Sequence, residues 1–381
     1  MQHIHGSRPL PRQILLCCML LMAVVFSGAC GGKKGSEAER PPVLEPLSGQ
    51  TPQQPDQATS RAPVQDALAG LAREAKGDPA TAAPESVEKN ATPSVRAQLL
   101  ASAGRADGQQ PEAGFLLTVP DRVWAGDPFI LEAGGQGLSK LSVSWRGKTV
   151  NVQPGVNGQP ADAAVLMLSV LLGQKEKELP ISISMTWDSG RVDTMQATIP
   201  VGKRKRPEQR LNVAPKYVNP PVEMEEKIKQ DQREVRETIA KVTPVRKWET
   251  PFLRPVPGVV TSLYGLRRVY NGEPRSPHRA IDFDAKEGDP IQVIADGTVV
   301  VVNEHYYGGN TVIVDHGLGV YSLYLHMSAF AVQPGQEVKR GDVLGAIGST
   351  GRVTGPHLHL GLAVQGEMVD PSPYTKGMGI K

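Results

Sequence analysis

Hydrophobic residues recur with two different spacings along this chain of 381 residues. Between Phe115 and Gly202, short apolar runs are separated by Gly, Asp, Asn and Pro, and in one of them Leu141, Val143 and Trp145 alternate with polar residues. Successive side chains of a strand point to opposite faces, so this alternation indicates half-buried strands. About seven such strands predict a small β-sandwich, of the immunoglobulin-like kind, over residues 115–202.

A second β-rich segment ends the chain, over residues 251–381. Apolar runs typical of strands recur there, in the order PIQVIA, GTVVVV, NTVIVDHG, VYSLYLH and HLHLGLAV, with the hairpin-like PGQEVKRGDVLG before the last. Repeated glycines at the predicted turns suit a strongly bent antiparallel sheet. The chain is therefore expected to be all-β, with two β-domains.

Residues 203–250 connect these domains and carry the second spacing. The basic run Lys203–Arg206 is predicted to be a solvated linker. Apolar residues then recur at steps of four, seven, four and three among charged neighbours, at Met224, Ile228, Val235, Ile239 and Val242. This spacing predicts one amphipathic connecting helix of about 20 residues, packed against one of the β-domains.

The N-terminus has the pattern of a targeting segment. Arg8 and Arg12 precede an apolar run over residues 14–26, which has signal-peptide length and is short for a membrane-spanning helix. We therefore predict a signal peptide over residues 1–29. Small residues at Ser27 and Ala29 suit cleavage that leaves Cys30 as the first residue.

Cysteine usage bears on the fate of that new N-terminus. Cys17 and Cys18 would be removed with the signal, so the exported chain has one thiol and no internal disulfide. The site resembles a bacterial lipobox, although Ser27 stands where Leu is usual. We predict lipidation at Cys30 and a membrane-anchored lipoprotein facing the periplasm or cell wall. The alternative is an accidental cysteine beside a plain cleavage site.

Residues 30–114 are predicted to be a disordered tether, because Gly31–Gly114 contains no aromatic residue and is dominated by Pro, Ala, Gln and Gly. Two weak amphipathic patches, over residues 64–71 and 95–100, are expected to form only transient helices. Lys and Arg total 42 against 39 Asp and Glu, and a net charge of +3 does not suggest a nucleic-acid partner.

The candidate chemistry is concentrated in the histidines. Of eight, His3 and His5 precede the export signal, and the other six all lie between His278 and His359. His357 and His359 are two apart on a predicted strand, so their rings share one face with backbones roughly 7 Å apart. Neutral imidazole is the commonest metal ligand and a frequent general base, so this crowding predicts a site.

The other half of the candidate site is SPHRAIDF. His278 and Asp282 would be roughly 13 Å apart on an extended chain, so the chain must bend to bring both to one ion. Two histidines and a carboxylate leave the fourth position of a tetrahedral zinc for water, as in catalytic sites. We expect His305 to be a surface or satisfied core residue, and His316 to be a turn residue bonded to backbone.

The pattern HxxxD, YxH and TGxHxH, over roughly Pro251 to Tyr374, resembles the lysostaphin-like (LytM-type) zinc endopeptidases that cut peptidoglycan cross-links. The resemblance implies a duplicated-hybrid-motif sheet with the metal in a groove. It also implies zinc ligands at His278, Asp282 and His359, and catalytic, non-ligand histidines at His326 and His357. The family usually has Gly where this chain has Ala280, which adds a methyl group that is expected to crowd the cleft and removes no chemical group.

The function expected from this resemblance is a Zn²⁺-dependent endopeptidase that hydrolyses peptide cross-links of peptidoglycan in the cell envelope. His357 would accept a proton from the attacking water and His326 would stabilise the oxyanion, although these roles are interchangeable. Expected partners are peptidoglycan, the membrane through the lipid anchor, and cell-wall synthesis or division proteins. The alternatives are a non-catalytic LytM-like regulator that activates a cell-wall amidase, and a structural lipoprotein that anchors the wall.

Overall fold

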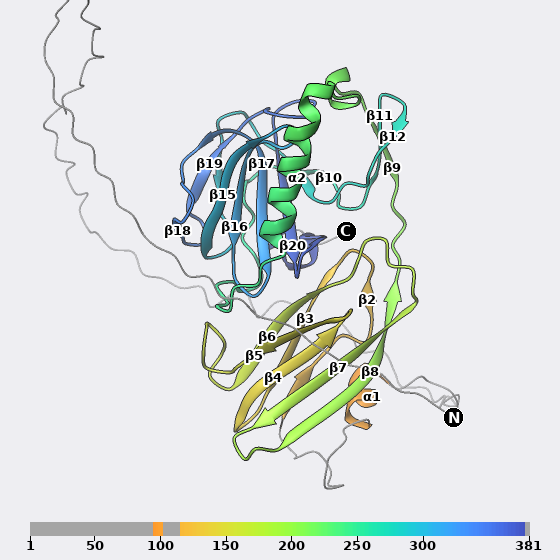
Figure 1. Ribbon diagram of the computed structural model, residues 1–381, viewed down its shortest axis with the longest axis vertical. Coiled ribbons are helices and arrows are strands. Elements are labelled where there is room, and N and C mark those ends of the chain that lie inside the picture. Colours follow the sequence, from red (N-terminus) through yellow and green to blue (C-terminus); the bar gives the residue numbers. More distant parts are fainter. Residues whose placement is uncertain (1–93, 102–114, 378–381) are drawn as a thin grey trace, which may run out of the picture. The chain divides into compact units, whose positions relative to one another are not determined.

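The structure, a computed structural model, describes residues 94–101 and 115–377 (Figure 1). Strands dominate this part of the chain, which confirms the all-β prediction. No helix among the described residues is long and apolar enough to cross a membrane. The predicted signal peptide, the lipidation site at Cys30 and the patch over residues 64–71 lie outside the described residues.

Residues 115–202 form two sheets, as the alternating pattern predicted. One sheet has the order β1–β3–β6, with β1 (Leu116–Thr118), β3 (Pro128–Gly134) and β6 (Ala163–Ser169). The other has the order β2–β8–β7–β4–β5, with β2 (Val123–Trp124), β8 (Val192–Gly202), β7 (Glu178–Trp187), β4 (Leu138–Trp145) and β5 (Lys148–Val152). Fully buried residues such as Leu131, Val143 and Ile183 come from both sheets and form one core. The immunoglobulin-like character of this sandwich stays a prediction.

The start of this domain corrects the predicted tether boundary. Residues Val95–Ala101 form helix α1, and its Val95 and Leu99 are buried in the sandwich core. The backbone N–H of Val95 also donates to Asp121 Oδ1 at 2.9 Å. The apolar residues four apart share one helix face, so packing against the sandwich stabilises a helix too short to persist alone.

The basic run after the sandwich was also misjudged, since two of its four cations have specific partners. Arg204 pairs with Asp127 at 2.6 Å, and Arg206 Nη1 donates to the Tyr264 carbonyl at 2.7 Å. The chain then forms β9 (Glu208–Leu211), which pairs in parallel with β11 (Arg267–Tyr270) of the C-terminal domain. A short β12 (Glu273–Pro274) completes this three-stranded sheet.

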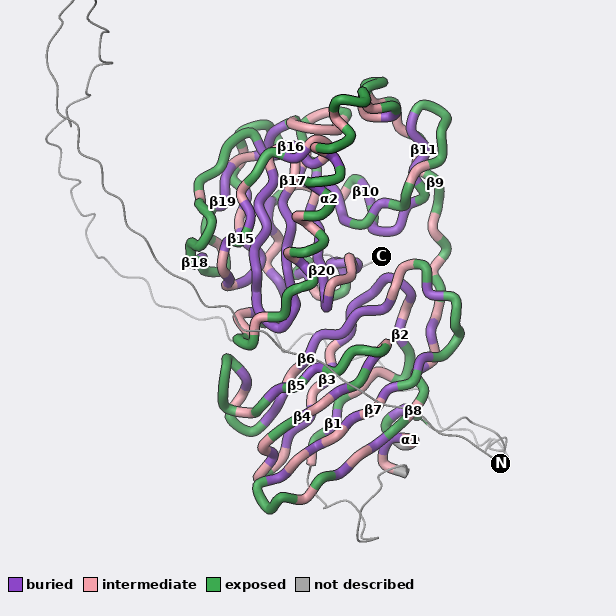
Figure 2. Tube along the Cα trace, in the orientation of Figure 1, coloured by how far each residue is buried: buried purple, intermediate pink, exposed green. Residues whose placement is uncertain are grey.

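Two short 3₁₀ helices, η1 (Pro215–Tyr217) and η2 (Val222–Met224), lead into α2 (Glu225–Ile239). The predicted connecting helix is confirmed but has 15 residues, and the exposed Val242 lies beyond its end. Ile239 packs with Val301 and Ile313 on the outer face of the C-terminal sheet. In Figure 1 helix α2 lies alongside strands of this sheet. In Figure 2 its residues alternate between buried and exposed, as expected for an amphipathic helix.

The C-terminal domain is built on a ten-stranded antiparallel sheet. Its main path is β10 (Val260–Ser262), β13 (Ile281–Asp284), β20 (His357–Val364), β17 (Val320–Phe330), β16 (Gly309–Asp315), β15 (Gly297–His305) and β18 (Glu337–Val338). Beside this path lie β14 (Pro290–Gln292), β19 (Val343–Ile347) and β21 (Glu367–Val369), and the helical turn η3 (Ser372–Tyr374) follows. Every apolar run that predicted a strand here contains one.

The strand register brings the candidate site together. In the β13–β20 pair Asp282 lies opposite His359, and in the β17–β20 pair Leu325 lies opposite His359. Side chains directly opposite each other share one face of a sheet. Asp282, His359 and the end of β17 therefore meet on three neighbouring strands.

Candidate metal centre

The site lies in a groove of about 530 Å³ on the C-terminal domain. All five predicted site residues line it, namely His278, Asp282, His326, His357 and His359. The groove is also lined by Gln209, Leu211 and Val213 from the connecting segment. The β9–β11 pairing therefore makes that segment part of the groove wall.

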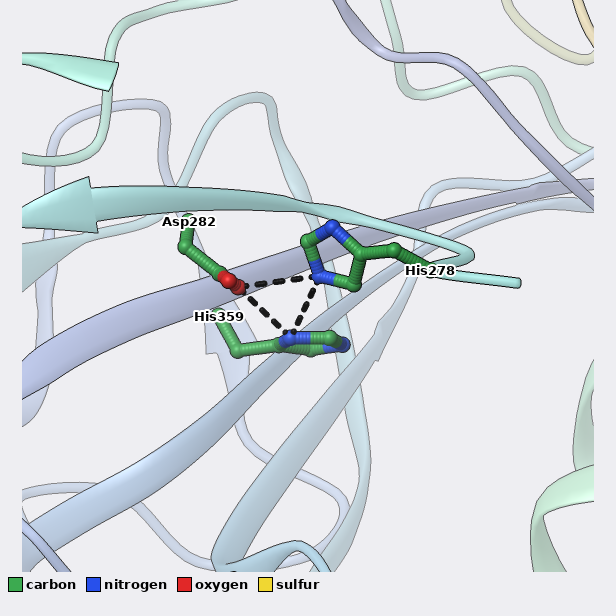
Figure 3. Close-up of side chains that lie close together, drawn as sticks. All are labelled: His278, Asp282 and His359. Carbon is green, nitrogen blue, oxygen red and sulfur yellow. Dashed lines mark hydrogen bonds and ion pairs between the residues drawn. The ribbon is translucent and has the colours of Figure 1, made fainter. Parts of the chain in front are cut away.

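Three of these residues converge on one point, as Figure 3 shows. Asp282 Oδ1 lies 3.0 Å from His278 Nε2 and 2.8 Å from His359 Nδ1, and the two nitrogens are 3.2 Å apart. Zinc ligands about 2.0–2.1 Å from the ion in a tetrahedron are roughly 3.3 Å from one another. The side chains therefore need to move apart by only a few tenths of an ångström to hold such an ion.

The protonation of His278 gives a second reason to place a cation here. Its Nδ1 lies 3.0 Å from the Leu263 carbonyl oxygen, which can only accept, so Nδ1 carries the proton. In the neutral ring Nε2 is then a lone pair facing the Asp282 carboxylate. Two acceptors this close repel each other unless a proton or a metal ion lies between them. The donor set fits a zinc ion.

Burial and neighbouring charge adjust the acid–base behaviour of the ligands. Burial raises the pKa of Asp282, but its contacts with His278 and His359 outweigh this and the net pKa lies well below the usual value. Burial lowers the pKa of His359 to about 4. Asp282 is thus a carboxylate and His359 a neutral imidazole at pH 7, which are the forms that bind metal.

Arg268 supports the centre from behind. Its Nη2 donates to Asp282 Oδ2 at 2.9 Å, while Oδ1 faces the two histidines. Both side chains are almost fully buried. A hydrogen bond to the oxygen that does not face the ligand cluster orients the carboxylate and keeps Oδ1 directed toward it.

The two remaining histidines lie beside this cluster. The ring centroid of His326 is 5.7 Å from that of His359 and 5.0 Å from that of His357. The Nδ1 atoms of His326 and His357 each lie 2.8 Å from a carbonyl oxygen, of Thr350 and Gly355 respectively. Carbonyl oxygens only accept, so both Nδ1 atoms carry a proton, and in its neutral form each ring has its lone pair on Nε2.

An unusual backbone conformation directs His326 into the groove. Its φ is +68°, in the left-handed region, and the β16–β17 register shifts nearby. In a regular strand Leu325 and His326 would point to opposite faces, yet both line the groove. The left-handed residue breaks the alternation and places the ring beside His359.

The histidines predicted to be structural are so. His316 is fully buried, and its two ring nitrogens bond the Asp296 carbonyl and the Ser322 hydroxyl, both at 2.7 Å. His305 Nε2 lies 2.8 Å from Glu234 Oε2 on α2. Neither lines the groove. Ala280 is fully buried and does not line it either, so its methyl group fills core and does not crowd the cleft as expected.

Several groove residues escaped the sequence reasoning. Arg268, Tyr270, Tyr307 and Arg352 all line the groove, but none belongs to the histidine motifs. Arg268 is the last residue of the run YGLRR, and only the fold shows that it faces Asp282. No spacing in the sequence marks these residues out.

Comparison with known proteins covers the same region. Residues 276–371 match the model of peptidase family M23. The peptidoglycan DD-endopeptidase ShyA of Vibrio cholerae is 42% identical over 112 residues, which are 29% of this chain and 26% of that protein. The DD-carboxypeptidase/endopeptidase Mpg of Neisseria meningitidis is 43% identical over 94 residues, or 25% of this chain and 22% of that protein. The chain thus spans about a quarter of the length of these relatives.

A solved structure extends the likeness to more of the fold. A crystal structure of a Pseudomonas aeruginosa protein assigned to peptidase M23 has a TM-score of 0.50 and 25% sequence identity. It covers 66% of this chain and 94% of that one. This share exceeds what the C-terminal domain alone can supply, so the likeness includes residues before it.

Proposed function

Because the C-terminal domain of this chain belongs to peptidase family M23, of the lysostaphin-like type, we propose that the protein is a zinc-dependent endopeptidase. Its substrate is the peptide part of peptidoglycan, and the bond is a cross-link between stem peptides. The names of the relatives ShyA and Mpg support a D-alanyl cross-link as the target. The family match identifies the C-terminal domain as a peptidase domain. We propose the zinc ion, the peptidoglycan substrate and the location in the cell envelope.

One observation carries this proposal. His278 Nε2, Asp282 Oδ1 and His359 Nδ1 lie 2.8–3.2 Å from one another, inside a groove that also holds His326 and His357. A structural zinc site would be closed by a fourth protein ligand. Within the described residues, the cluster contains three candidate ligands and leaves the fourth position open.

Bound there, zinc would polarise the scissile carbonyl and lower the pKa of its water toward about 7. The chain's own residues handle the protons. Burial, together with the rings of His359 and His357, lowers the pKa of His326 well below its usual value, so this ring is neutral at pH 7. Its unprotonated Nε2 suits a general base that accepts a proton from the attacking water and returns it to the leaving amine.

The same geometry constrains the oxyanion donor. A neutral ring whose proton is on Nδ1 cannot donate from Nε2, so either histidine must be protonated before it stabilises an oxyanion. We assign the general base to His326, whose ring is neutral at pH 7 and lies 5.7 Å, centroid to centroid, from that of His359, and the oxyanion donor to His357. This is the exchanged form of the sequence-based assignment, which left the two roles interchangeable.

The location in the cell envelope rests on the N-terminal sequence. We propose that the signal is cleaved before Cys30, that this cysteine is lipidated, and that the protein faces the periplasm or cell wall. Three acyl chains would hold the protein firmly, because each buried CH₂ contributes about 0.8 kcal/mol. Cell-wall synthesis or division proteins are the partners expected at that location.

Digestion of purified peptidoglycan by the full zinc-loaded chain, with identification of the fragments by mass, tests the function. We expect cross-linked dimers to be converted to monomers, with new D-alanine carboxyl ends. Intact peptidoglycan in the presence of a chain with full zinc content would overturn the proposal. Stimulation of a cell-wall amidase by that inactive chain would establish the regulator function instead.

A further inference from the structure

A second charged feature lies in the catalytic groove, away from the metal ligands. The Arg352 guanidinium carbon is 4.9 Å from the ring centroid of Tyr270 and 4.5 Å from that of Tyr307. All three side chains line the groove. They come from three separate segments, namely β11, the β15–β16 turn and the β19–β20 loop. We call these three residues the arginine clamp.

The clamp is held in place by a backbone contact that adjoins those of His326. The Arg352 backbone N–H donates to the Tyr307 carbonyl at 2.9 Å. Gly308, next to Tyr307, accepts the backbone N–H of His326, and Thr350, two residues before Arg352, accepts its Nδ1–H. The clamp is therefore positioned relative to the reacting groups by backbone hydrogen bonds and does not depend on a flexible side chain alone.

The third member of the clamp is tied to the metal ligands. Tyr270 lies on β11 two residues after Arg268, and its hydroxyl is 3.4 Å from an Arg268 nitrogen. Arg268 in turn binds Asp282. Tyr270 itself is buried, so its ring is a rigid platform for the guanidinium.

The charge of Arg352 is not used within the described part of the chain. No carboxylate there lies within ion-pair distance of its guanidinium, whereas Asp282, the acidic metal ligand in the groove, is already bonded to Arg268. Stacking on tyrosine rings occupies the faces of a guanidinium and leaves its N–H edges free. A planar fork of donors matches a carboxylate with two parallel hydrogen bonds.

We propose that the arginine clamp binds a free carboxylate of the peptide substrate beside the scissile bond. The inference rests on the proposed peptidase function and specifies its substrate. A cross-link to the side-chain amine of a diaminopimelate residue has such a carboxylate next to the bond, whereas a glycine bridge has none there. The clamp thus selects cross-links whose leaving amine carries a negative charge.

The test compares two cross-linked dimers, one with the diaminopimelate carboxylate free and one with it amidated. Hydrogen bonds to charged groups are strong enough that losing this pair should lower kcat/KM about ten- to hundredfold. We expect the wild-type chain to prefer the free-acid dimer by that factor, and Arg352→Gln to cleave the two dimers at nearly equal rates. Arg352→Lys should retain only part of the preference, because an ammonium lacks the fork.

Arg267→Gln is the matched control. Arg267 lies on the same strand β11, its side chain is 67% exposed, and it does not line the groove. This variant should keep the wild-type preference. Zinc content should equal the wild-type value in all variants, since none touches a ligand.

Binding separates the inference from the proposed function. In calorimetric titration, the Kd of a free-acid tetrapeptide product should be at least about tenfold lower for the wild-type protein than for Arg352→Gln. This holds whether or not the dimers are cleaved. Equal losses of Arg352→Gln on both dimers would show that Arg352 only joins the loops, and would overturn the inference. Equal binding of the tetrapeptide to both proteins would overturn it as well. Failure to cleave either dimer, with tetrapeptide binding as expected, would refute the peptidase function alone.

Discussion

Replacement of His326 by asparagine should separate its chemistry from its structural role. The residue has φ +68°, and its Nδ1 donates to the Thr350 carbonyl at 2.8 Å. Asparagine is among the few non-glycine residues that tolerate this backbone region, and its amide NH₂ can replace Nδ1–H. It has no counterpart of Nε2. His326→Asn therefore keeps the anchor and removes the proposed base.

The expected loss of activity is large and the loss of stability small. Removing a general base typically costs 10²–10⁴-fold in rate, or about 3–5 kcal/mol in activation free energy. Trimming the buried ring leaves a small void, which we set at about 1–2 kcal/mol of unfolding free energy. For a domain of this size that lowers Tm by about 2–8 °C. Zinc content should be unchanged.

His326→Ala is the informative companion variant. Alanine removes the same base but also the hydrogen bond, at about 1 kcal/mol, and it is strained in the left-handed region by about 1 kcal/mol more. Both variants should be equally inactive, with His326→Ala less stable than His326→Asn by about 2 kcal/mol.

Three measurements on each purified variant decide the matter, namely turnover on cross-linked dimers, zinc content and thermal unfolding. Turnover of His326→Asn within tenfold of wild type, with zinc retained, would refute the base assignment. Loss of zinc in that variant would instead show that His326 belongs to the metal-binding set. Equal stability of the two variants would contradict the argument from backbone geometry.

Other changes test the rest of the molecule. Replacing His278, Asp282 or His359 by Ala should abolish tight binding of about one zinc per chain, and undiminished zinc in all three variants by elemental analysis would refute the ligand set. Asp127 tests the pH dependence of stability, because burial raises its pKa from 3.8 to about 6 despite the opposing Arg204. A raised folded pKa means that this residue stabilises the fold more as pH falls through 6 toward 4, by up to about 3 kcal/mol. In urea unfolding, the unfolding free energy of wild type minus that of Asp127→Asn should therefore increase as the pH is lowered from 7 to 4.5. A decrease would contradict the sign. Finally, Cys30→Ser should move the protein from the membrane fraction to the soluble exported fraction with wall-degrading activity intact, whereas a soluble, unmodified wild-type protein would disprove the anchor.

Local sequence patterns were sufficient to predict much of the fold and to recognise the ligand motif. Alternation along Leu141–Trp145 and the runs from PIQVIA to HLHLGLAV predicted strands, because side-chain alternation is a property of one strand and needs no partner. The ligand motif was visible for a similar reason. His278 and Asp282 are four residues apart and His357 and His359 two apart, so each half of the site is a short stretch of chain.

Tertiary contacts decided what the sequence left open or indicated wrongly. Residues 95–101 look like a marginal helix until the sandwich covers Val95 and Leu99. The residues next to Arg204 are typical of a solvated linker, yet Arg204 pairs with Asp127, 77 residues away in the chain. Such contacts depend on which surfaces the folded chain brings together, and no local spacing records them.

The chemistry of the groove was decided in the same way. The sequence identified His326 as a candidate, but its left-handed φ and the carbonyl bonded to its Nδ1 determine which nitrogen can accept a proton. Likewise, Arg352 lies 82 residues beyond Tyr270 in the chain and becomes a candidate substrate-binding group only when the sheet brings both to one groove. A motif names the atoms that can react, whereas the register and turns of the folded sheet set their protons, their distances and their neighbours.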